Sequence, residues 1–81
     1  MAAPRKLYKV ADLMRHAGVS RQTVHNYTML GLIRPVERTE SGHRLYDETV
    51  FERLRRIKLL TIHRTLEEVR DILVQEDKEE A

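Results

Sequence analysis

Hydrophobic and polar positions near the start of the chain alternate with a helical period. The apolar positions recur at spacings of three and four residues, at Val10, Leu13, Met14 and Ala17. This spacing predicts a helix with one buried face. Gly18 is expected to end that helix in a left-handed conformation. Ser20 is a good N-cap for a second helix, which we expect to run from Arg21 to about Leu30.

The second predicted helix is mostly polar, with Val24 and Tyr27 expected to face the core. Two helices joined by so short a turn predict a helix-turn-helix. The outward side chains are suited to hydrogen bonding with base edges and phosphates. These candidates are Arg21, Gln22, Thr23, His25 and Asn26. An ordinary pair of helices with a polar outer face remains the alternative interpretation at this point.

The next segment predicts a small β-hairpin. Val36 and the pair Leu45–Tyr46 flank a polar stretch, 39–42, that contains a glycine. A hairpin of this size is not stable alone, so we expect it to pack on the helices through these apolar residues. Its exposed arm carries Arg38, His43 and Arg44. A basic hairpin beside a polar helix is typical of a DNA-binding wing, although a solvated hairpin with incidental charges is the alternative.

Two further helices are predicted. Asp47 is a plausible N-cap for a helix that reaches about Ile62 and has a basic outer surface. Thr65 and Glu68 have the spacing of a capping box and predict the start of a fourth helix. The inward positions expected for these two helices are Val50, Leu54, Ile57, Leu60, Leu66, Val69, Ile72 and Leu73.

Composition narrows the function. With 81 residues and no cysteine, the chain suits one domain with a modest core, and it contains neither a disulfide nor a cysteine-ligated metal. Up to residue 64 there are 13 basic and 6 acidic residues, a net charge of +7, which suits a polyanionic partner. From residue 65 there are 2 basic and 7 acidic residues, a net charge of −5.

The sequence gives no support for an enzymatic function. No two histidines are four residues apart, so no helical metal pair is expected, and no catalytic residues, metal or cofactor are assigned. No apolar run is long enough for a membrane span, and residues 1–6 lack the apolar stretch of a signal peptide. We therefore expect a cytoplasmic protein that is not an enzyme and that associates with the nucleoid when bound to DNA.

The order of these motifs resembles the DNA-binding domain of MerR-type transcription regulators. The matching segments are 8–13, 17–20, Thr23–Val24, Tyr27, 31–35, 38–47 and 66–73. The resemblance implies a mainly α winged helix-turn-helix over 8–74, with about four helices and a two-stranded hairpin as the wing. Residues 1–7 are then a flexible N-terminus, and 75–81 are an acidic tail or the start of a linker.

The resemblance also implies a function. Helix 21–30 would lie in the major groove of a promoter or operator, and the wing, 36–46, would contact the backbone. Matched contact positions are Arg21, Thr23, His25, Asn26, Tyr27, Arg38, His43 and Arg44. Family members act as homodimers, whereas this stretch alone is expected to be a monomer. His25, Asn26 and His43 depart from the usual arginine and aromatic residues, which predicts a distinct sequence preference.

Two other functions remain as alternatives. An excisionase-like factor that bends DNA shares the winged plan. A helix-turn-helix face can also bind a protein partner, such as an anti-repressor that mimics DNA. We expect the chain to be a segment of a longer regulator rather than a naturally minimal protein. The operator, the signal and the choice between activation and repression are not predicted.

Overall fold

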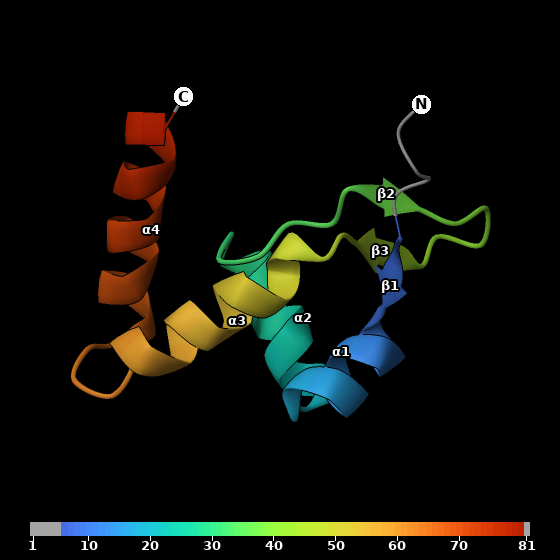
Figure 1. Cartoon of the computed structure of the whole chain (residues 1–81), viewed down its shortest axis with the longest axis horizontal. Coiled ribbons are helices and arrows are strands. Elements are labelled where there is room, and N and C mark those ends of the chain that lie inside the picture. Colours follow the sequence, from blue (N-terminus) through green and yellow to red (C-terminus); the bar gives the residue numbers. More distant parts are fainter. Residues whose placement is uncertain (1–5, 81) are drawn as a thin grey trace.

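The computed structural model describes residues 6–80 and contains four helices and a small sheet (Figure 1). The helices are α1 (Val10–Ala17), α2 (Arg21–Met29), α3 (Thr49–Leu60) and α4 (Leu66–Glu80). The strands are β1 (Tyr8–Lys9), β2 (Glu37–Arg38) and β3 (Arg44–Tyr46). The prediction of a mainly α winged helix-turn-helix with about four helices is confirmed.

The turn between α1 and α2 is formed as predicted. Gly18 has a φ of +68°, and its amide donates to the carbonyl of Met14, which ends α1. A residue with a Cβ would be strained in this left-handed conformation. The hydroxyl of Ser20 accepts a hydrogen bond from the amide of Thr23, so Ser20 is the N-cap of α2. Helix α2 ends one residue earlier than expected, at Met29.

The sheet has one more strand than predicted. Its order is β1-β3-β2, and all its neighbours are antiparallel. Tyr8 pairs with Tyr46, so the residues just before α1 form a strand along one edge of the hairpin. The predicted two-stranded hairpin forms as β2 and β3, and β1, which begins just after the expected flexible lead of residues 1–7, adds a third strand to it. The part of that lead in 1–5 lies outside the described residues.

Helices α3 and α4 also differ from expectation at their ends. The carboxylate of Asp47 accepts from the amide and the hydroxyl of Thr49, but α3 begins only at Thr49 and ends at Leu60 rather than at Ile62. The Thr65–Glu68 capping box is confirmed, with amide–side-chain distances of 3.0 and 3.2 Å. Helix α4 continues through Glu80, so the residues from 75 to 80, expected as an acidic tail or the start of a linker, are helical.

All four helices and the sheet contribute to one core. Tyr46 is fully buried, so the hairpin is anchored through β3, whereas Val36 is 40% exposed. Predicted inward residues Ile72, Leu60 and Leu66 are only half-buried. The buried residues are Leu13, Val24, Leu32, Ile33, Tyr46, Val50, Leu54, Ile57, Val69 and Leu73. Across residues 6–80, none of the helices has the length and apolar character needed to cross a bilayer.

Candidate nucleic-acid interface

Helix α2 presents a polar surface to solvent. Its candidate residues Arg21, Gln22, His25 and Asn26 are exposed. The side-chain amide of Gln22 donates to the Asn26 side chain at 2.9 Å, so two groups suited to base contacts are held together one helical turn apart. This face has free hydrogen-bonding capacity and a positive charge at its N-terminal end.

The two other candidates on α2 are partly engaged inside the protein. The Thr23 hydroxyl lies 2.8 Å from the Ser20 hydroxyl, within the N-cap of the helix. Tyr27 is half-buried against the core. Both residues therefore contribute to the shape of the turn and the helix, and they offer less free surface than Asn26 or His25.

A contact that the sequence did not predict joins α2 to the sheet. The Thr28 hydroxyl donates to the carbonyl of Val24 at 2.8 Å. Since a hydroxyl has one proton, the buried Tyr46 hydroxyl, 2.7 Å away, must be the donor to Thr28. This bond links α2 to the central strand of the sheet and gives the only polar group of the Tyr46 side chain a partner.

The hairpin has two arginines at facing positions. Arg38 and Arg44 are register partners in the β2–β3 pair, so their side chains lie on one face of the ribbon. Within the described part of the chain, no ion pair involves either residue. Like charges placed opposite each other are unfavourable until an anion lies between or beside them. This pair therefore favours binding of a polyanion.

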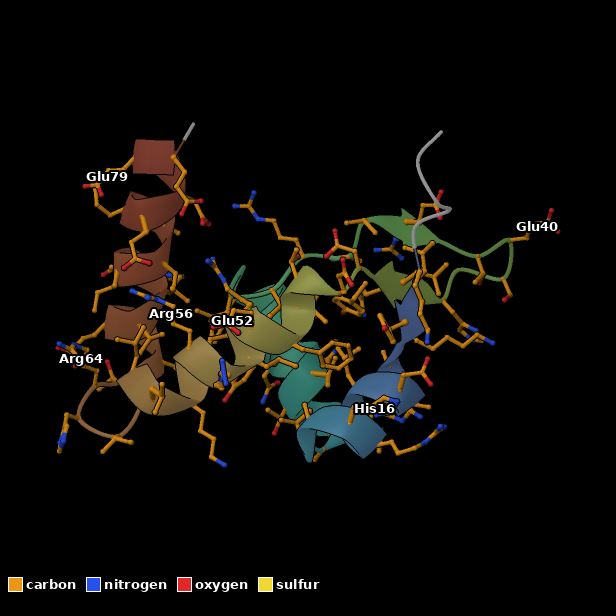
Figure 2. The ribbon with its side chains drawn as sticks, in the orientation of Figure 1. His16, Glu40, Glu52, Arg56, Arg64 and Glu79 are labelled. Carbon is orange, nitrogen blue, oxygen red and sulfur yellow. The ribbon has the colours of Figure 1, made fainter. Side chains whose placement is uncertain are left out.

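The tip of the hairpin is shaped by local hydrogen bonds. The Thr39 hydroxyl accepts from the amide of His43 at 3.0 Å, and Gly42 has a φ of +89° in the turn. Figure 2 shows Glu40 at the far end of this loop, extended away from the helices. His43 is exposed, so it joins the arginines on the wing.

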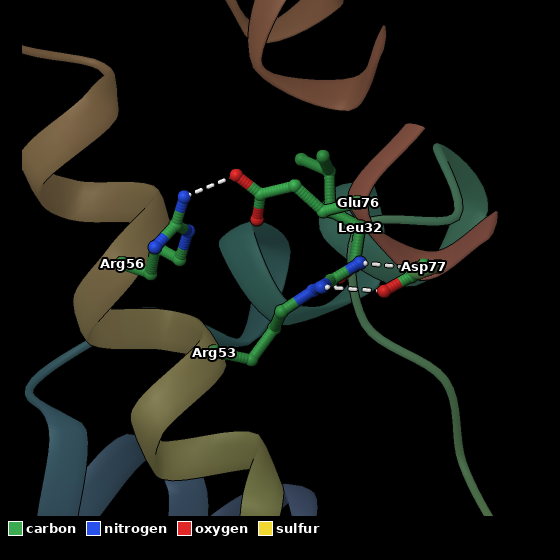
Figure 3. Close-up of polar contacts among 5 residues, drawn as sticks. All are labelled: Leu32, Arg53, Arg56, Glu76 and Asp77. Carbon is green, nitrogen blue, oxygen red and sulfur yellow. Dashed lines mark hydrogen bonds and ion pairs between the residues drawn. The ribbon is translucent and has the colours of Figure 1, made fainter. Parts of the chain in front are cut away.

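The basic residues of α3 are arranged differently. Arg53 forms a two-point ion pair with Asp77, and Arg56 pairs with Glu76 on α4 (Figure 3). Arg55 pairs with Glu52 at 3.1 Å. Much of the charge of α3 is thus balanced within the chain, whereas the arginines of the wing are not.

The structure keeps the predicted residues in two groups, one on α2 and one on the wing. Between described residues, no hydrogen bond joins a candidate side chain of one group to the other group. Tyr46 was expected to pack the hairpin on the helices, but the sequence did not indicate Thr28 as the partner of its hydroxyl on α2. Residues 6–80 contain no cluster of histidine or acidic side chains suited to a metal.

Comparison with known proteins relates this arrangement to regulators of transcription. Residues 9–46 match the model described as MerR family regulatory protein. The mercuric resistance operon regulatory protein of Bacillus cereus is 36% identical over 75 residues, which cover 91% of this chain and 57% of that protein. The nodulation protein NolA of Bradyrhizobium diazoefficiens is 38% identical over 56 residues, covering 69% of this chain and 24% of NolA.

A solved structure supports the same relation. The N-terminus of MtaN, the multidrug transporter activator of Bacillus subtilis, superposes with a TM-score of 0.76 at 34% identity, covering 82% of this chain and 63% of that one. The chain thus spans less than two thirds of each relative. The names of the Bacillus cereus protein and of MtaN describe a regulator and an activator, which confirms the prediction that the chain is not an enzyme and does not favour the excisionase-like alternative. Together, the motifs, the fold and these similarities support a DNA-binding domain of the MerR family.

Proposed function

We propose that the chain binds double-stranded DNA sequence-specifically, with α2 in the major groove and the β2–β3 wing on the backbone. The observation that carries this proposal is the facing pair Arg38 and Arg44, which has no acidic partner among the described residues. Neutralising phosphates with such side chains releases counterions and drives association.

The two groups of candidate residues have different tasks in this proposal. The wing arginines and His43 hold phosphates and set the register, as backbone contacts usually do. Arg21, Gln22, His25 and Asn26 face the base edges, with the linked pair Gln22 and Asn26 suited to an adenine or a neighbouring base pair. Thr23 and Tyr27 support the helix and add contacts at its margin.

The proposal extends to the longer regulator of which this domain would be a part. Such a regulator would act as a homodimer on two half-sites, because a single module of this size binds only one half-site. It would work in the cytoplasm, on promoter or operator DNA. The domain alone would be a monomer in solution.

Selection from a random duplex library tests the proposal. The domain should enrich one short half-site, and the enriched duplex should bind far more tightly than the starting pool. If repeated rounds enrich no sequence, the proposal of sequence-specific binding is wrong. If no duplex binds even at low salt, an acidic protein partner on the same face becomes the better candidate.

A further inference from the structure

A single side chain connects three parts of the molecule that lie far apart in the sequence. The Nε atom of Arg53, on α3, donates to the carbonyl oxygen of Leu32 at 2.7 Å. Its two terminal nitrogens donate to the carboxylate of Asp77, on α4, at 3.1 and 3.0 Å. Figure 3 shows the Arg53 side chain reaching from α3 to Asp77 on α4. All three nitrogens of the guanidinium are therefore used in one planar, fixed geometry.

The carbonyl of Leu32 belongs to the backbone that connects α2 to the wing. Leu32 is the third residue after α2 and lies in this connecting segment, 30–36. The amides of Leu32 and Ile33 both donate to the carbonyl of Tyr27, at 2.9 and 3.4 Å. Arg53 thus adds a side-chain hydrogen bond to the backbone that connects α2 to the wing.

Helix α4 holds Arg53 in place. A groove separates α4 from the segment after α2; its walls include Ile33 and Val36 on one side and Glu76 and Glu80 on the other. Arg53 also lines this groove, and its side chain is 24% exposed. The ion pair of Arg56 with Glu76, one residue before Asp77, keeps the same turn of α4 close to α3.

We propose that Arg53 is a positioning residue for DNA binding: held by Asp77, it fixes the connection between recognition helix and wing. The inference rests on the proposed function, because it assumes that both elements contact one duplex. Releasing Arg53 from Asp77 loosens the Leu32 carbonyl, and the domain then loses affinity because the two elements must be ordered on binding.

The test uses Asp77→Asn, with Glu79→Gln as the matched control. Both changes remove one negative charge from the same end of α4, but Glu79 is exposed and has no hydrogen bond or ion pair among those described. Because the chain has no cysteine, spin labels can be placed at Met29→Cys on α2 and Glu40→Cys on the wing alone. Distances between the labels are measured by double electron–electron resonance, and affinity by anisotropy on a fluorescent random-sequence duplex.

We expect Asp77→Asn to broaden the distance distribution and to lower affinity relative to Glu79→Gln by about fivefold or more, the lower end of typical coupling effects. Arg53→Lys, which keeps the charge but loses the planar fork, should behave like Asp77→Asn. An unchanged distribution, or an affinity equal to that of the control, would overturn the inference. If the parent domain binds no duplex, the proposed function is wrong. The inference then fails as well, whatever distances the spin labels report between α2 and the wing.

Discussion

The hydroxyl pair of Thr28 and Tyr46 shows how single residues determine the arrangement of the interface. Tyr46 is fully buried, and its hydroxyl donates to Thr28 on α2. Tyr46→Phe keeps the ring in the core but removes this bond, so the free energy of unfolding should fall by about 1 kcal/mol. Chemical denaturation measures the change. Tyr8→Phe is the control, and equal stabilities of the two variants would contradict the importance of the Tyr46 bond.

Glu68 links stability to pH through the capping box. Hydrogen bonds from the Thr65 amide and hydroxyl, aided by nearby Arg64, lower the pKa of the Glu68 carboxyl. A group whose folded pKa is lowered contributes stability that is complete above its ordinary pKa and is lost as the pH falls through the folded pKa. Glu68→Gln, which has no charge, should therefore be less stable than the parent near neutral pH.

That difference should shrink as the pH falls below the ordinary glutamate pKa. Thermal unfolding of both proteins across the acid range measures it. A stability difference that stays constant down to acid pH would mean that the charge of Glu68 contributes nothing to the cap.

Local signals of this kind were predictable from the sequence. Gly18, Ser20 and the Thr65–Glu68 box each depend on residues within four positions, and all three occur as predicted. The Thr28–Tyr46 bond joins residues 18 apart in the sequence, and the Arg53–Asp77 pair joins residues 24 apart. No local pattern indicates such partners, because they depend on how the helices pack.

At the scale of elements, the wing presents two facing arginines that have no ion pair among the described residues. Arg44→Ala should weaken binding to every duplex sequence, because the side chain is proposed to hold a phosphate. It should also lower the slope of log affinity against log salt by about one. Lys78→Ala removes the same charge from an exposed position on α4, so it should alter the slope less. Equal slopes for the two variants would contradict the assignment of the wing.

The recognition helix should respond in a different way. Asn26→Ala removes a group proposed to contact a base, so the preference at one base pair should weaken by about 1–3 kcal/mol. Selection of preferred duplexes with the parent, with Asn26→Ala and with Arg44→Ala measures this. The Arg44 variant should keep the parent's preferred site, and an unchanged site for the Asn26 variant would exclude its role in base recognition.

The helices were predicted well where apolar residues recur with a helical spacing, and less well at the helix ends. Strand β1 has two residues and exists through its pairing with β3, so no alternation along the chain could indicate it. The end of α4 was expected from its acidic composition to be a tail or the start of a linker, and Glu76 and Asp77 in it pair with arginines of α3. In both places tertiary partners decide the local structure.

For the whole molecule, the basic and acidic parts of the sequence lie in different places in the fold. The acidic α4 stands at one side of the molecule and the wing at the other (Figure 1). Glu76 and Asp77 of α4 pair with Arg56 and Arg53 of α3, whereas Arg38 and Arg44 of the wing have no ion pair among the described residues. The sequence predicted a basic body and an acidic end, but only the fold reveals which arginines remain free.

An NMR titration of the labelled domain with the selected duplex at low salt tests most directly whether α2 and the wing form one DNA interface. The largest amide shifts should fall in 21–27 and 38–44, with α4 little changed. Shifts confined to α3 and α4, or no shifts at all, would contradict the proposed interface.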